Sequence, residues 1–168
     1  DEVVEAATDR RGDEPEQPVD LGDLVERVAE RARRRSGREV VVHRLGPATV
    51  SGRPLALERA VTNLVENALK FDSGVQPIEV TCEGGRVEVA DRGPGIAAAD
   101  RPHVFDRFYR STDARSRPGS GLGLSIVAEV VAGHGGRTFS AERAGGGAVV
   151  GFVLPVGPEP AGRTGATA

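Results

Sequence analysis

The chain has 168 residues, 22 basic and 25 acidic side chains and a net charge of −3, which suits one compact domain. A weakly acidic balance argues against non-specific nucleic-acid binding as the main activity. The single cysteine excludes an internal disulfide and a multi-cysteine zinc site, and the sequence contains neither a membrane-spanning apolar run nor a signal-peptide pattern.

The first eighteen residues are charged and contain two prolines. We expect residues 1–7 to end an upstream helix and residues 8–18 to be a linker. Because the chain starts at Asp1 and contains no methionine, we expect it to be a piece of a longer protein. The domain itself is expected to occupy residues 19–156, followed by a disordered tail at 157–168 that is rich in Gly, Pro and Ala.

A helix is predicted from Leu21 to about Ser36, with Asp20 as its N-cap and Gly37 as its end. Arginines crowd the C-terminus of this helix, where positive charge is favoured; a nucleic-acid patch is the weaker alternative. Later elements follow from apolar periodicity and Gly-rich breaks. Helices are expected at 54–70 and 122–132, and strands at 39–45, 78–82, 86–90, 138–142 and 148–154, with a possible short partner strand at 48–50. Such an order suggests one layer of helices on a mixed sheet.

The helix at 54–70 carries Asn63, Asn67 and Lys70 on one face, at positions i, i+4 and i+7. Amide oxygens can bind Mg²⁺ or its water ligands, and the only lysine of the chain can contact a phosphate. The alternative is an ordinary solvated helix face.

The strand at 86–90 places Val87, Val89 and Asp91 on the same side. A carboxylate that follows two core valines needs a hydrogen-bond donor, and an exocyclic amine such as that of adenine would satisfy it. The Gly93-Pro94-Gly95 run then allows a flat ligand to approach the backbone closely. The alternative is a turn-capping aspartate.

Glycines at 119, 121 and 123 open the third helix, where backbone N–H groups and the helix dipole favour an anion. The pattern is neither a dinucleotide fingerprint nor a P-loop. An aromatic segment precedes it at 104–110, and the polar stretch at 111–118 between them has the composition of a mobile lid. Arg107 and Arg110 could contact a transferring phosphate, or the segment could be a small satellite core with surface arginines.

Four motifs in this order resemble the N, G1, F and G2 boxes of bacterial sensor histidine kinases: NLVENALKF at 63–71, DRGPG at 91–95, FDRFYR at 105–110 and GSGLG at 119–123. The resemblance implies a GHKL-type (Bergerat) α/β sandwich, with one mixed sheet of about five strands covered on one face by three helices and a mobile ATP lid. It implies ATP and Mg²⁺ as ligands, with the metal on Asn63 and Asn67. The implied catalytic residues are Asn63, Lys70, Arg107 and Arg110. The implied nucleotide-binding residues are Asn63, Asn67, Lys70, Phe71, Asp91, Gly93, Gly95, Ile96, Phe105, Phe108, Gly119, Gly121, Leu122 and Gly123.

The phosphoacceptor of such kinases is a histidine on a separate dimerisation helix, followed by an acidic residue and then proline. His43, His103 and His134 all lack this context, and His134 is better explained as a favourable helix-end residue. We therefore expect the ATP-binding domain alone. Its expected partners are the dimerisation domain of its own parent protein and, through that histidine, a response regulator. We expect the fragment to be monomeric and to be the cytoplasmic part of a membrane sensor.

Two alternatives remain. One is a hydrolytic ATPase of the same fold, and the resemblance implies that such relatives carry Glu where this chain has Asn63. A carboxylate can act as a general base on water, whereas an amide cannot. Glu66 is near in sequence but points about 100° away from Asn67 around the helix. The other alternative is a nucleotide-binding regulatory module without transfer activity.

Overall fold

The computed structural model describes residues 14–109 and 122–157. The expected upstream helix end at 1–7, the expected lid at 111–118 and nearly all of the expected tail lie outside the described residues. Among the described helices, none combines the length and apolarity needed to cross a membrane.

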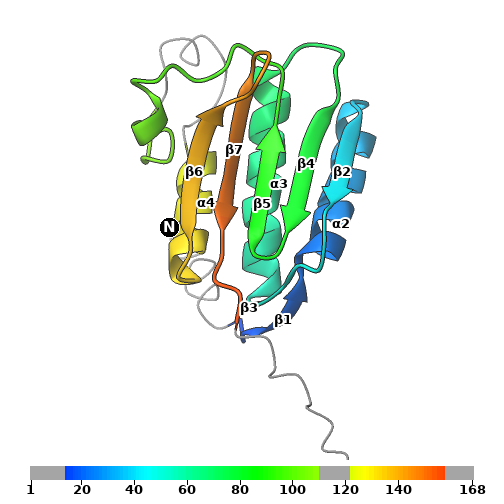
Figure 1. The fold of residues 1–168 in the computed structure, drawn as a ribbon, viewed down its shortest axis with the longest axis vertical. Helices are drawn as coiled ribbons and strands as arrows, with labels where there is room; N and C mark the ends of the chain where they lie inside the picture. The colour runs from blue at the N-terminus through cyan, green and yellow to red at the C-terminus, as the bar shows by residue number, and fades with distance from the viewer. Residues whose placement is uncertain (1–13, 110–121, 158–168) are drawn as a thin grey trace, which may run out of the picture.

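The described residues form two layers, a five-stranded sheet and three helices that cover one of its faces (Figure 1). The strands lie in the order β2 (Val40–Arg44), β4 (Ile78–Glu83), β5 (Arg86–Ala90), β7 (Ala148–Val153) and β6 (Arg137–Glu142). β2 and β4 pair in parallel and the other neighbours pair antiparallel, so the sheet is mixed. The helices are α2 (Leu21–Ser36), α3 (Pro54–Phe71) and α4 (Gly123–Gly133). A short 3₁₀ helix, η1 (Arg101–His103), precedes the aromatic segment. The predicted sandwich is confirmed.

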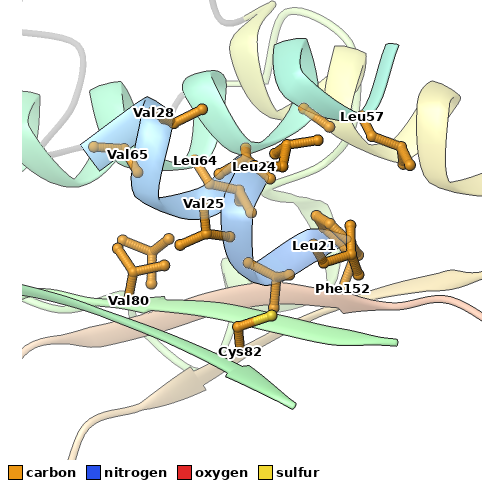
Figure 2. Close-up of a cluster of buried hydrophobic side chains, with 14 of the residues drawn as sticks. Leu21, Leu24, Val25, Val28, Leu57, Leu64, Val65, Val80, Cys82 and Phe152 are labelled. Carbon is orange, nitrogen blue, oxygen red and sulfur yellow. The ribbon is translucent and has the colours of Figure 1, made fainter. Parts of the chain in front are cut away.

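The core lies between the two layers and consists mainly of aliphatic side chains. Ile78, Val80 and Cys82 alternate along β4 with no exposed surface and point toward the helices. Figure 2 shows the leucines and valines of α2 and α3 meeting the side chains of the sheet, with Phe152 of β7 among them. Burial on this scale is the main source of stability for the domain. The packing of these side chains also determines which face of α3 is turned away from the sheet.

A second, two-stranded sheet lies at the end of the molecule where α3 begins (Figure 1). It consists of β1 (Gln17–Asp20) and β3 (Thr49–Gly52), which run antiparallel. The predicted pairing of residues 48–50 with the strand at 39–45 is therefore wrong, and β1 begins inside the segment that we expected to be a linker. Pro18 suggested a linker, but proline is tolerated on an edge strand because no ladder N–H is needed there.

The helix ends follow the predicted capping pattern at α2. Asp20 accepts a hydrogen bond from the backbone N–H of Asp23 at 3.1 Å. Gly37 adopts a φ of +68° and donates to the carbonyl of Arg33, as a C-terminal glycine does.

The start of α3 is capped from elsewhere in the chain. The carboxylate of Glu14 accepts the backbone N–H groups of Leu55 at 2.8 Å and Ala56 at 3.3 Å. His134, which follows α4, accepts the N–H of Arg53 through Nε2 at 3.0 Å and donates from Nδ1 to the carbonyl of Val130 at 2.7 Å. His134 therefore joins the end of α4 to the beginning of α3, which agrees with the predicted structural role.

Candidate functional site

Helix α3 carries the predicted polar face beside its buried face. Leu57, Val61, Leu64 and Ala68 are buried against the core, whereas Asn63 and Asn67 are half-buried and Lys70 is exposed. The Lys70 ammonium lies 5.2 Å from the centroid of the Phe71 ring. The apolar periodicity of the sequence thus determines which side of α3 presents two amides and an ammonium.

The N-terminus of α4 lies beside this polar face. A Cβ atom built on Gly123 would stand 3.7 Å from Oδ1 of Asn63, so the structure brings the N-box and G2-box residues together. Leu122 is the N-cap residue of α4 and its side chain forms no capping hydrogen bond. A helix start without a side-chain acceptor has N–H groups that can bind an anion.

Asp91 follows β5 and is 4% exposed, as strand alternation predicts. Its Oδ1 atom accepts the backbone N–H of Gly93 at 2.9 Å and of Ala148 at 3.2 Å. Asp91 therefore does cap the turn, but among the described residues both of its hydrogen bonds fall on Oδ1, and Oδ2 can still accept from a ligand. Burial raises the pKa of Asp91; its two backbone hydrogen bonds oppose this shift and the negative charge of Asp72 adds to it.

The glycines after Asp91 permit two close backbone contacts. A Cβ on Gly93 would come within 2.7 Å of the carbonyl oxygen of Phe71, so this turn lies directly against the end of α3. Gly95 has a φ of +77° and lies close to the backbone of Gly147. The G1 turn is thus held between α3 and the β6–β7 turn, and no larger residue fits at Gly93.

The aromatic segment is only partly packed. Phe105 and Ile96 are half-buried against the core, while Phe108 is 64% exposed with a φ of +63°. The guanidinium of Arg107 lies 5.3 Å from the centroid of the Phe108 ring. Phe105 therefore anchors the segment and Phe108 does not. Arg110, Gly119 and Gly121 lie outside the described residues, so their predicted roles stay predictions.

One residue of the site was not singled out from the sequence. Asp72, next to Phe71, is 1% exposed and accepts the N–H of Arg92 through Oδ2 at 2.9 Å. Its Oδ1 atom accepts the N–H of Gly74 at 2.8 Å. Asp72-Ser73-Gly74 repeats the Asp-x-Gly pattern of Asp91-Arg92-Gly93, in which aspartate accepts the N–H two residues on. This repeated Asp-x-Gly pattern is the sequence feature from which a turn-capping role of Asp72 could have been predicted.

A groove of about 850 Å³ runs along the outer surface of α2 and α3. Asn63 and Lys70 line it, together with Ile126 of α4 and with Arg31 and Arg35 of α2. Asp91 is not among its lining residues. Within residues 14–109 and 122–157, no three His, Cys, Asp or Glu side chains gather as a metal site. Asn63 and Asn67 are suitable donors for Mg²⁺, which prefers oxygen ligands and keeps several waters.

These features define a class of protein: an α/β sandwich with an amide-bearing helix, a helix N-terminus close to it and a buried strand-end aspartate. Residues 52–158 match the model of the histidine kinase-, DNA gyrase B- and HSP90-like ATPase family. The chain belongs to this family, and within it to the ATP-binding domains of sensor histidine kinases.

The relatives and solved structures agree with this assignment. The chain is 39% identical over 170 residues to the signal transduction histidine-protein kinase/phosphatase MprB of Mycolicibacterium vanbaalenii, and the match covers 96% of this chain but 35% of that protein. The chain thus spans about a third of the length of this curated relative. A solved structure of the mycobacterial sensor histidine kinase MprB superposes with a TM-score of 0.72 at 37% identity, covering 83% of this chain and 97% of the other.

Two further structures are similar. The ATP-binding domain of PrrB from Mycobacterium tuberculosis superposes with a TM-score of 0.69 at 28% identity, over 85% of this chain and 98% of the other. Full-length ShkA in complex with AMPPNP superposes with a TM-score of 0.70 at 32% identity, over 83% of this chain and 31% of the other. The family and the ATP-binding character of the domain, both expected from the four motifs, are confirmed.

Proposed function

We propose that this chain is the kinase domain of a sensor histidine kinase, which transfers the γ-phosphoryl group of Mg²⁺-ATP to a histidine on a separate dimerisation domain of its parent protein. The observation that carries the proposal is the polar face of α3. It presents the amide of Asn63, not a carboxylate, to the N-terminus of α4, 3.7 Å from the Cβ position of Gly123.

Each proposed role follows from the chemistry of a side chain. Asn63 and Asn67 would hold Mg²⁺, which neutralises the charge of the phosphates when it is bound. Lys70 supplies a compact positive charge one helical turn further on, and the first N–H groups of α4 face the same region. Asp91 accepts a hydrogen bond from the exocyclic amine of adenine. We extend the proposal to Phe71, Ile96, Phe105 and Leu122 as walls of the nucleotide site.

The surroundings of Glu66 favour transfer over hydrolysis. Glu66 forms an ion pair with Arg35 of α2 at 3.1 Å, so its carboxylate is turned toward α2. A general base must lie within hydrogen-bond distance of the water that it activates. Glu66 lines the same groove as Asn63 and Lys70, but because its carboxylate pairs with Arg35, we infer that it is not aimed at a water molecule beside Asn63.

The three histidines of the chain are engaged in other contacts. His134 uses both ring nitrogens in hydrogen bonds to backbone groups. His43 lies near Glu79 at 3.5 Å, and His103 lies near Asp106 at 3.1 Å. Because none of the three is followed by the acidic residue and proline of a phosphoacceptor, we infer that the acceptor histidine belongs to another part of the parent protein and that the response regulator receives the phosphoryl group from there. Because ATP is a cytoplasmic substrate, we place the domain on the cytoplasmic side of a membrane sensor.

The proposal is tested by incubating the chain with γ-labelled Mg²⁺-ATP. We expect nucleotide binding, negligible phosphate release and no acid-labile label on the chain. Stable labelling of His43, His103 or His134 would contradict the assignment of the acceptor to another domain. Release of phosphate at about 1 s⁻¹ or faster, within the usual range of enzymes, would instead support a hydrolytic ATPase.

A further inference from the structure

Asp72 joins three segments that are distant in the sequence. Its side chain is buried at the end of α3 and accepts N–H groups from Arg92 and Gly74. Arg38, which lies between α2 and β2, approaches Oδ1 of Asp72 at 3.5 Å. The same guanidinium donates to the backbone carbonyls of Asp72 and Gln76. Three elements thus converge on one buried carboxylate.

The contact with Arg92 lies one residue from the proposed base-recognition group. Arg92 and Gly93 form the turn after Asp91, and their two consecutive N–H groups are held by two different carboxylates. Asp72 accepts the first at 2.9 Å and Asp91 accepts the second at 2.9 Å. Because a Cβ on Gly93 would meet the Phe71 carbonyl at 2.7 Å, the turn fits closely against α3 and its orientation depends on how the end of α3 holds it.

We propose that Asp72 is a positioning residue for nucleobase recognition: it holds the turn at 91–93 against the end of α3, so that Oδ2 of Asp91 faces the base while Lys70 faces the phosphates. The inference rests on the proposed role of Asp91. Asp72 does not touch the nucleotide in this account. It fixes the distance between the group that recognises the base and the helix that carries the phosphate-binding residues.

Replacing Asp72 by asparagine tests this account with a side chain of nearly the same shape. In the structure Gly74 and Arg92 donate to two different oxygens of Asp72, and in asparagine one of these two positions is taken by an NH₂ group, which donates and cannot accept. We expect calorimetry of Asp72→Asn to show ATP binding weakened about tenfold, in line with the loss of a hydrogen bond to a charged acceptor. Inorganic triphosphate has no base, so its dissociation constant for Asp72→Asn should stay within about twofold of that for the unmutated protein, since Asp72 acts only on base recognition.

A destabilised control separates positioning from general loosening. Val25→Ala removes buried volume from α2, far from the turn, and should lower the melting temperature without changing the ratio of triphosphate to ATP dissociation constants. Asp72 is not a positioning residue if Asp72→Asn weakens the binding of ATP and of triphosphate equally, or leaves both unchanged. The same holds if it changes the ratio of their dissociation constants only as much as Val25→Ala does.

Asp91→Asn distinguishes failure of this inference from failure of the proposed function. If Asp91→Asn loses ATP binding but not triphosphate binding, and Asp72→Asn shows no such selective loss, the inference is overturned while base recognition by Asp91 stands. An unchanged ratio in Asp91→Asn would overturn base recognition itself, and the positioning role with it. The N–H of Arg92 gives a direct structural readout, since its hydrogen exchange should accelerate in Asp72→Asn and not in Val25→Ala.

Discussion

Asp72 and Asp91 each accept one N–H of the same dipeptide, Arg92–Gly93, and both hydrogen bonds measure 2.9 Å. Both carboxyl groups are buried, yet their pKa values shift in opposite directions. Burial alone would raise the pKa of Asp72, but the N–H groups of Arg92 and Gly74 and the charge of Arg38 lower it below its ordinary value. Burial raises the pKa of Asp91 and prevails over its two backbone hydrogen bonds. The fold therefore favours the ionised form of Asp72 and disfavours the ionised form of Asp91.

The free energy of unfolding should depend on Asp72 only when its carboxyl group is ionised. The pKa of Asp72 is lowered in the folded state. Its contribution to the free energy of unfolding is therefore present at a pH above its pKa in the unfolded chain, about 3.8, and is lost as the pH falls through its pKa in the folded protein. Asp72→Asn should cost about 1–3 kcal/mol at pH 7, the range for a buried hydrogen bond left unsatisfied. Urea unfolding at neutral and acidic pH measures the difference, and a cost that stays constant across that range would contradict this linkage.

Asp91→Asn should behave in the opposite way in the absence of nucleotide. The pKa of Asp91 is raised in the folded state. Its contribution to stability is therefore full at a pH below its pKa in the unfolded chain, and is lost as the pH rises through its pKa in the folded protein. At pH 7 the neutral amide therefore avoids the cost of a buried charge. We expect the melting temperature of the nucleotide-free variant to equal or exceed that of the unmutated protein, while the stabilisation by added ATP disappears. A large loss of stability without nucleotide would show that Asp91 is chiefly structural.

His134→Ala should destabilise the domain through the junction of α3 and α4. Only the neutral imidazole with its proton on Nδ1 can donate to Val130 and accept from Arg53, so the substitution leaves two backbone groups without their partner. We expect a cost of about 1–3 kcal/mol in urea unfolding. His43→Ala is the matched control, because its side chain is 44% exposed and surface substitutions usually change stability by less than about 0.5 kcal/mol. Equal effects of the two variants would rule out the junction role.

Asn67→Ala should abolish Mg²⁺-dependent nucleotide binding, because it removes one of the two amide oxygens that we propose would hold Mg²⁺. The neighbouring Glu66→Gln provides the control, since Glu66 pairs with Arg35 on the α2 side and should leave binding nearly unchanged. Titration with and without Mg²⁺ distinguishes the two variants. Retained Mg²⁺ dependence in Asn67→Ala would exclude this amide as a metal ligand.

The sequence predicted most of the sandwich because its helices and strands carry clear periodicity. Helix α3 was expected at 54–70 and spans Pro54–Phe71, and the strand at 86–90 was expected with the bounds that β5 has. The inward placement of Asp91 followed from strand alternation. These features depend on local pattern, which sequence analysis reads best.

The features that were missed depend on contacts between distant residues. Asp72 looked like part of a loop, because its partners Arg38 and Arg92 lie in other elements. Glu14 caps α3 from outside the predicted domain, and no local pattern marks such a long-range cap. Pro18 suggested a linker, although β1 pairs there with β3. Tertiary contacts overrode local signals in all three cases.

The most direct test of the kinase proposal supplies the missing acceptor. The chain is mixed with γ-labelled Mg²⁺-ATP and with the histidine-bearing dimerisation domain of its parent protein as a separate polypeptide, and label on each polypeptide and free phosphate are measured together. We predict acid-labile label on the dimerisation domain, none on this chain, and negligible free phosphate. Free phosphate released at about 1 s⁻¹ or faster, with no label on the dimerisation domain, would contradict the account.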